Sequence, residues 1–140
     1  RRPSLQLVLV GPRGLPDEPG LRQIGRVADS EMATWLAAAQ AFVYPSLYEG
    51  FGLPVLEAMS LGVPVIASCD PALVEVAGGC ALHVPADSPE RLSAAILRVT
   101  SDPDLADRLR ADGLVRAGEF SWRRTARLTR ELYVEAIDAW

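Results

Sequence analysis

The 140-residue sequence contains no lysine and no asparagine, so all 14 of its basic residues are arginine. A phosphate-binding P-loop needs a lysine at the phosphates, and a pyridoxal enzyme needs a lysine for its Schiff base. Both classes are therefore excluded. A flavodoxin-like receiver domain also needs a phosphate-sensing lysine, which nearly eliminates that signalling class as well.

Several other features are scarce. The 14 arginines face 18 acidic residues, and the net charge of −4 argues against nucleic acid as the main partner. Cys69 and Cys80 are too few for a disulfide framework, and their apolar neighbours predict two reduced core thiols. The longest charge-free apolar stretch, residues 58–69, is too short and too interrupted by Gly and Pro to cross a bilayer. No signal-peptide pattern opens the chain, so we expect one cytoplasmic domain.

Apolar runs alternate with helical patterns along the whole chain. The runs predict strands at 5–10, 21–24, 41–44, 65–67 and 81–84. Helices are expected from Asp29 or Ser30 to 39, and over 54–61, 72–76, 89–100, 103–117 and 121–140. Continuous apolar strands separated by helices indicate an α/β fold, a Rossmann-like doubly wound parallel sheet with a helical C-terminal tail. Ligands bind such sheets outside the carboxyl ends of the strands, which directs attention to 11–20, 25–29, 45–54 and 68–72.

The loop PSLYEGFGLPVLEA, residues 45–58, is the richest of these segments in functional groups. Its two glycines let the backbone approach a ligand, and Pro54 is expected to open a helix whose N-terminus points at the same place. Free amides and the helix dipole together favour an anion such as pyrophosphate. Glu49 and Glu57, the latter expected in the first helical turn, flank these amides and could accept hydrogen bonds from the hydroxyls of a sugar or ribose. On spacing alone, Glu57 as a helix-stabilising residue and Glu49 as a solvated loop residue remain equally open.

The longer segment PSLYEGFGLPVLEAMSLGVPVIAS, residues 45–68, closely resembles the signature of retaining glycosyltransferases of family 4 (glycosyl transferases group 1). That signature contains two glutamates separated by seven residues, as Glu49 and Glu57 are. The segments at 24–31, 75–76 and 120–122 also fit the family pattern. The resemblance implies a GT-B enzyme, in which two Rossmann-like domains face a cleft. Residues 1–140 would form the C-terminal, nucleotide-sugar-binding domain.

The resemblance also implies roles for individual residues. Glu49, at the catalytic position, would hold the transferred hexose, and Glu57 would hold the ribose hydroxyls; neither is assigned as a nucleophile. The backbone amides of Gly50, Phe51, Gly52 and Leu53 would meet the donor sugar and phosphates, and Arg26 and Val27 would flank the base. The substrate would be an NDP-sugar such as GDP-mannose or a UDP-hexose, whose hexose passes to a hydroxyl acceptor. Neither a cofactor nor a metal is expected.

Some family features have no counterpart here. The family's Arg/Lys pair for the donor pyrophosphate lies upstream; Arg1 and Arg2 do not match its setting, and Arg13 is a weak substitute. We therefore expect the acceptor domain and the first strand and helix of this domain to be missing, and the chain alone to be inactive. Expected partners are that missing domain, a second copy of the fragment and, for the full enzyme, peripheral contact with a membrane. The alternative function is a non-catalytic nucleotide-binding module of the same fold.

Three weaker signals have structural interpretations. Asp102-Pro103-Asp104 imitates a metal motif but predicts a helix start, with Asp102 as cap. His83, the only histidine, is expected to be structural at a strand end. The tail carries an apolar stripe at 4-3-4-3-4 spacing that predicts burial or, where exposed, a surface for self-association. Its members are Trp122, Ala126, Thr129, Tyr133, Ala136 and Trp140.

Overall fold

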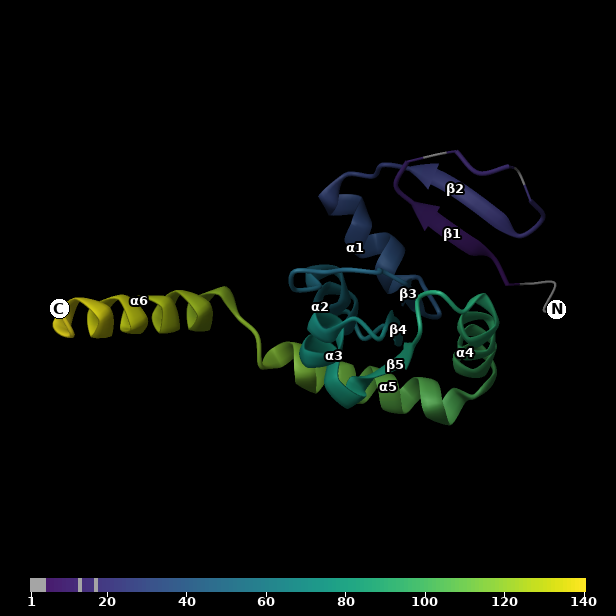
Figure 1. The fold of residues 1–140 in the computed structure, drawn as a ribbon. Helices are drawn as coiled ribbons and strands as arrows, with labels where there is room; N and C mark the ends of the chain where they lie inside the picture. The colour runs from purple at the N-terminus through teal and green to yellow at the C-terminus, as the bar shows by residue number, and fades with distance from the viewer. Residues whose placement is uncertain (1–4, 13, 17) are drawn as a thin grey trace. The chain divides into compact units, whose positions relative to one another are not determined.

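Every apolar run expected to form a strand does so, and every pairing between described strands is parallel. The computed structural model describes residues 5–12, 14–16 and 18–140, and the chain divides into two units, Arg1–Trp35 and Leu36–Trp140. The strands form two sheets, one of order β1-β2 in the first unit and one of order β3-β4-β5 in the second (Figure 1). The expected parallel α/β fold is confirmed, with its strands in two sheets.

The N-terminal unit pairs β1 (Leu7–Val10) with β2 (Leu21–Gly25). The side chain of Gln23 holds the connecting loop, because its Nε2 donates to the Leu15 carbonyl at 2.8 Å and its Oε1 accepts from Leu15 N at 3.1 Å. The guanidinium of Arg22 lies 5.2 Å from the ring centroid of Trp35, a cation–π contact on α1 (Asp29–Ala37). Arg13 lies outside the described residues.

The C-terminal unit is built on the sheet of β3 (Phe42–Tyr44), β4 (Val65–Ser68) and β5 (Ala81–Val84). All four residues of the central strand β4 are buried, as a strand covered on both faces should be. Ile66 on β4 belongs to a core cluster with Val99 of α4 (Pro89–Ser101) and Leu109 of α5 (Pro103–Gly118).

The remaining helices of this unit are short and follow the strands closely. They are α2 (Leu53–Ser60), α3 (Pro71–Ala77) and the single 3₁₀ turn η1 (Gly78–Cys80). Helix α2 packs closely on α5, where a Cβ added to the buried Gly113 would lie only 3.2 Å from Met59 Cγ. Asp102 caps α5 through a 3.0 Å hydrogen bond from Leu105 N, which confirms its expected role.

The cysteines are free, as expected, but they are not core residues. Cys69 is exposed because it follows the last residue of β4, beyond the buried part of the strand. Cys80 is half-buried, and burial raises the pKa of its thiol. The prediction that both thiols are free is confirmed, but the prediction that they lie in the core was wrong.

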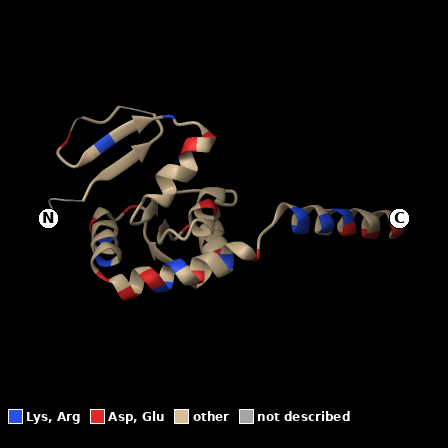
Figure 2. Ribbon diagram, turned by 180° about the vertical axis from the view of Figure 1, so that it is seen from behind, with Lys and Arg blue, Asp and Glu red and all other residues tan. Residues whose placement is uncertain are grey.

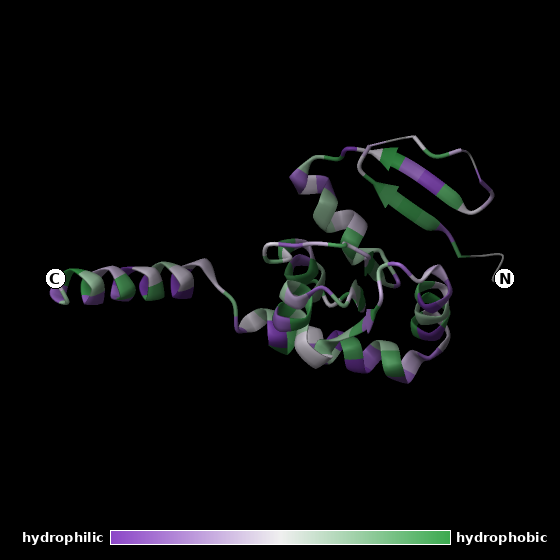
Figure 3. Cartoon of the chain, in the orientation of Figure 1, coloured by the Kyte–Doolittle hydropathy of each residue, from purple (hydrophilic) through white to green (hydrophobic). Residues whose placement is uncertain are grey.

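The last helix, α6 (Trp122–Asp138), has no buried residue. Hydrophobic and hydrophilic residues alternate along it (Figure 3), and the expected apolar stripe is fully exposed, with Tyr133 68% exposed. Among the described residues, no helix is long and apolar enough to cross a membrane.

Candidate active site at the end of strand β3

The loop between β3 and α2 carries the residues singled out in the sequence. It leaves the sheet at Tyr44 and enters α2 at Leu53. Leu47 and Tyr48 within it are 80% and 85% exposed, so the loop buries little apolar surface of its own. Its shape therefore depends on one special glycine and on a few polar contacts.

That glycine is Gly52, which is buried and has a φ of +94°. A Cβ at this position would lie 2.4 Å from Leu73 Cδ2, on a side chain that is itself completely buried. Both the backbone conformation and the close packing thus require glycine. The sequence predicted Pro54 as the first helical residue. The turn at Gly52 already places Leu53 inside the helix, so Pro54 is the second.

The backbone amides that follow Glu49 have no partner inside the described chain. The N–H groups of Gly50, Phe51, Gly52 and Leu53 donate to no described residue. They sit where α2 begins, at the positive end of the helix dipole. The expected set of free donors is therefore present, and such a set suits an anion.

Glu49 is held at both its backbone and its side chain. The Tyr44 hydroxyl donates to Glu49 Oε1 at 2.7 Å, and the Glu49 amide donates to Asp70 Oδ2 at 3.4 Å. Partial burial of the phenol, the hydrogen bond to Glu49 and the charge of that carboxylate together raise the pKa of Tyr44 to about 12. Tyr44 thus remains a neutral donor at physiological pH, and Glu49 is an oriented carboxylate rather than a freely solvated one.

Glu57 lies in α2 and is exposed to solvent. It occupies the second turn of the helix, because the first turn contains no acidic residue; the expected first-turn position was wrong. This placement weakens the helix-dipole explanation for Glu57, since that effect is confined to the first turn. The exposed carboxylate is free to accept hydrogen bonds from a ligand.

Arg26 and Val27 belong to the other unit. They follow β2 and precede α1, where Arg26 is exposed and Val27 is half-buried. Their expected role beside the base stays a prediction.

Sequence reasoning missed Asp70 and Ser68, two residues that support the loop. Asp70 caps α3, with Oδ1 accepting from Ala72 N at 2.9 Å, while its Oδ2 accepts from Glu49 N. Ser68 Oγ accepts from Asp70 N at 3.3 Å, and Ser68 is 1% exposed. The Asp-Pro dipeptide at 70–71 matches the one at 102–103 and could have predicted the cap, but no local pattern indicates the contact with Glu49.

His83 has the structural role expected of it. It lies in β5, with Nδ1 2.9 Å from the Ser68 carbonyl and Nε2 3.0 Å from the Gly78 carbonyl. Each ring nitrogen faces a carbonyl oxygen, so the ring lies between the end of β4 and the C-cap of α3 and neither nitrogen is open to a substrate for base chemistry.

Phe51 connects the loop to the end of α5. Its ring meets Phe120 edge to face, with centroids 6.1 Å apart and an interplanar angle of 79°. The Arg116 guanidinium lies 4.9 Å from the Phe120 ring centroid and donates to the carbonyls of Val76 and Glu75 at 2.9 and 2.8 Å. Residues distant in sequence therefore brace the segment that presents the free amides.

Two of the hollows on the described surface bear on where a ligand could bind. One, of about 300 Å³, lies at the carboxyl ends of β3, β4 and β5, as expected of a ligand site in a parallel sheet. Its lining includes Ser46, Leu47, Ser68, Asp70 and Asp87.

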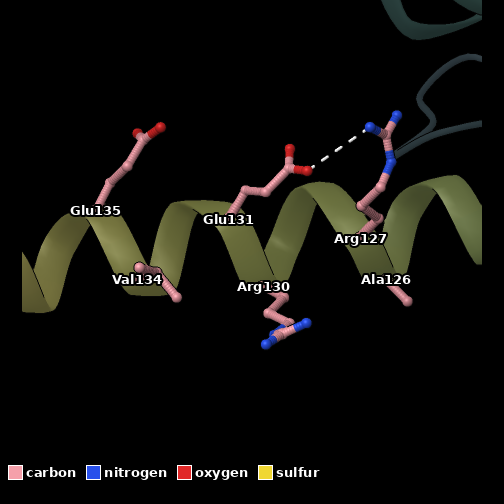
Figure 4. Close-up of a pocket in the computed structure, with 6 residues that line it drawn as sticks. All are labelled: Ala126, Arg127, Arg130, Glu131, Val134 and Glu135. Atoms are coloured by element: carbon pink, nitrogen blue, oxygen red, sulfur yellow. Dashed lines mark ion pairs between the residues drawn. The ribbon is translucent and has the colours of Figure 1, made fainter.

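The larger hollow runs along α6 and is lined by residues of that single exposed helix, including the ion pair Arg127–Glu131 at 3.6 Å (Figure 4). The side chains of one solvated helix do not enclose a ligand. The hollow at the sheet adjoins the β3–α2 loop through Ser46 and Leu47, but Glu49, Glu57 and residues 50–53 do not line it. Within the described part of the chain, no group of three or more His, Cys, Asp and Glu side chains is arranged to hold a metal ion.

These features define the class of protein: a parallel α/β domain with free amides and carboxylates at the carboxyl end of its strands. A family model for glycosyl transferases group 1 matches residues 1–102, and the chain belongs to this family. It is 40% identical to O-antigen chain mannosyltransferase B from Escherichia coli over 91% of the chain and 36% of that protein. It is 45% identical to MMP alpha-(1->4)-mannosyltransferase from Mycolicibacterium hassiacum over 79% of the chain and 28% of that protein.

Solved structures agree with this assignment. Sucrose-phosphate synthase from Thermosynechococcus elongatus is similar over 96% of the chain and 39% of that structure, with a TM-score of 0.82 and 30% identity. The C-terminal domain of a glycosyl transferase group 1 family protein from Francisella tularensis is similar over 73% of the chain and 54% of that structure, with a TM-score of 0.65 and 30% identity. The chain thus spans about a third of the length of the curated relatives described above.

Proposed function

We propose that the chain is the donor-binding part of a retaining glycosyltransferase of family 4, which transfers a hexose from an NDP-sugar to a hydroxyl acceptor. The observation that carries this proposal is the row of unpartnered amides at residues 50–53, at the N-terminus of α2, between Glu49 and Glu57. Family membership supports the transfer of a glycosyl group.

In this proposal the amides and the helix dipole bind the donor diphosphate, and Glu57 accepts hydrogen bonds from the ribose hydroxyls. Glu49, oriented by Tyr44, accepts hydrogen bonds from the transferred hexose. The catalytic contribution of the amides is electrostatic, because fixed donors stabilise the charge that develops on the leaving diphosphate. Arg26 and Val27 flank the base, and no metal or cofactor takes part.

Two named mannosyltransferases among the relatives make GDP-mannose the first donor to test, with UDP-hexoses as the alternative. Because those relatives are much longer than this chain, we propose that the acceptor site, and further positive charge for the diphosphate, lie in parts of the enzyme outside these residues. The chain alone should show at most slow donor hydrolysis. We place the enzyme in the cytoplasm, with peripheral contact to a membrane.

Titration calorimetry of the chain with GDP and UDP tests the proposal. We expect one of them to bind, and Glu57→Gln to weaken it about tenfold or more, as expected for the loss of hydrogen bonds to a charged group. Glu90→Gln, a change of an exposed glutamate on α4, is the matched control and should not change nucleotide binding. If the folded chain binds neither nucleotide, the proposal is wrong.

We also propose that the isolated chain self-associates through α6. The arginines of this helix lie in its first half and its acidic residues in its second half (Figure 2). They are Arg123, Arg124, Arg127 and Arg130, followed by Glu131, Glu135 and Asp138. Two copies of α6 packed antiparallel through their apolar stripes would place opposite charges side by side.

A further inference from the structure

We propose that Asp70 is a positioning residue for Glu49, and that it sets how the candidate site holds the donor hexose. This inference rests on the proposed function, because it concerns the part of the donor that Glu49 would contact. Asp70 lies at the start of α3, 21 residues from Glu49 in sequence.

Asp70 has more hydrogen-bond acceptors than a helix cap needs. A cap needs one side-chain oxygen, and serine or asparagine serves about as well as aspartate. Asp70 Oδ1 fills this role alone, accepting from Ala72 N at 2.9 Å and from Leu73 N at 3.4 Å. The second oxygen is directed to the Glu49 amide across the carboxyl edge of the sheet.

The other Asp-Pro cap of the chain provides an internal comparison. Asp102 precedes Pro103 as Asp70 precedes Pro71, and Asp102 Oδ1 accepts from Leu105 N at 3.0 Å. No second contact of the Asp102 carboxylate occurs within the described residues. The bridge to a distant loop is thus a property of Asp70 and not of Asp-Pro caps in general.

Few other contacts hold the loop in place at Glu49. Leu47 and Tyr48, which precede Glu49, are almost fully exposed, so packing does not fix the backbone at this point. Within the loop, Ser46 Oγ donates to the Tyr48 carbonyl at 3.1 Å, a local contact that does not tie the loop to the sheet. Asp70 itself is fixed, because its amide donates to the buried Ser68 Oγ at 3.3 Å. The chain of contacts therefore runs from the buried end of β4 through Asp70 to the Glu49 backbone, while Tyr44 orients the Glu49 carboxylate.

The test separates the capping of α3 by Asp70 Oδ1 from the contact of Asp70 Oδ2 with the Glu49 amide. Asp70→Ser keeps a capping oxygen but lacks the second one, and Asp102→Ser is the matched control at the other cap. Amide hydrogen exchange should become at least about fivefold faster at Glu49 in Asp70→Ser, while exchange at the Ala72 amide and in the core helices is unchanged. Asp102→Ser should leave the Glu49 amide at its wild-type exchange rate.

The functional measurement is the ratio of two dissociation constants, Kd for GDP divided by Kd for GDP-mannose. If the chain binds UDP and not GDP, the same ratio is taken for UDP and UDP-glucose. Glu49→Gln defines how far this ratio falls when the hexose contact is weakened. Asp70→Ser should lower the ratio in the same direction by about three- to tenfold, the effect of losing one hydrogen bond, with Kd for the free nucleotide unchanged. A purely structural defect would weaken both ligands together.

Asp70→Asn is the second variant, because its single oxygen can serve either partner. If Asp70→Ser does not fold, Asp70→Asn replaces it. We expect its ratio of dissociation constants to equal the wild-type ratio if the Glu49 amide stays protected from hydrogen exchange, and to be lower if that amide loses protection. The proposal is overturned if the Glu49 amide loses protection while the ratio stays constant, or if Asp70→Ser leaves that amide protected. Failure of the proposed function is distinct, since the wild-type chain would then bind neither GDP nor UDP.

Discussion

Replacing Gly52 by alanine should destabilise the chain by about 1–4.5 kcal/mol. The φ of +94° puts a non-glycine residue in a left-handed conformation, at a cost of about 1–2 kcal/mol. The new methyl would lie 2.4 Å from Leu73 Cδ2, and because Leu73 is completely buried, overpacking adds about 1–3 kcal/mol. The reduced entropy of the unfolded chain offsets about 0.4–1 kcal/mol of this total.

Urea unfolding followed by circular dichroism measures the effect. Gly50→Ala is the matched control two residues away, since no atom lies within 4 Å of its added Cβ and its φ is not positive. It should change the free energy of unfolding by less than about 1 kcal/mol. A loss of about 1–4.5 kcal/mol against a total of about 5–15 kcal/mol would shift the urea midpoint measurably.

The clash and the backbone strain can be separated by a double-mutant cycle. Leu73→Ala removes the obstructing methyl groups, so Gly52→Ala should cost about 1–3 kcal/mol less in that background than in the wild type. If the free energy of unfolding of Gly52→Ala lies within about 0.5 kcal/mol of the wild-type value, the range of neutral surface changes, neither the strain nor the clash is present. Equal destabilisation by Gly50→Ala would likewise show that position 52 is not special.

Three further changes test other parts of the structure. The raised pKa of Tyr44, about 12 against 10.0, stabilises the fold fully below pH 10, and this contribution is lost as the pH rises to about 12. After allowance for its partial exposure, wild-type unfolding free energy should fall by about 1–2 kcal/mol more than that of Tyr44→Phe between pH 9 and 12. Arg116→Met removes the donors to the Val76 and Glu75 carbonyls and should lower the free energy of unfolding, measured by thermal unfolding, by about 1–3 kcal/mol. Arg110→Met, the control, breaks only an exposed ion pair and should lower it by less than about 1 kcal/mol. Tyr133→Glu on the exposed stripe of α6 should lower the apparent mass in sedimentation equilibrium if the chain self-associates there, and an unchanged mass would place the contact elsewhere.

The order of elements could be predicted because the chain is strongly punctuated. Proline stands in the first turn of α2, α3, α4 and α5, and the apolar runs between these helices are too short for anything but strands. The start of α2 was misplaced by one residue, since only the positive φ of Gly52 reveals that Leu53 already belongs to the helix. Local patterns thus determined which elements form, and backbone conformation determined where they begin.

The contacts around Glu49 could be predicted only in part. The free amides followed from the two glycines and the helix start, which are local features. The bridge from Asp70 joins residues 21 positions apart, and it exists because β3 and β4 are neighbours in the sheet. A sequence pattern can predict that Asp70 caps a helix, but the second use of its carboxylate depends on three-dimensional proximity.

The two halves of the candidate site differ in how they are held. The junction with α2 is anchored, because Gly52 is buried and the helix places Val55 and Met59 in the core, so this end of the predicted diphosphate site belongs to the rigid part of the fold. Glu49 precedes that helix on a loop, and its carboxylate and amide each make a single hydrogen bond, with Tyr44 and Asp70 respectively. A change at either of these residues can therefore move the hexose contact while the packing of α2 stays intact. Since rigid elements give precise positions and loops tolerate change, selectivity for the sugar should be altered more easily than affinity for the nucleotide.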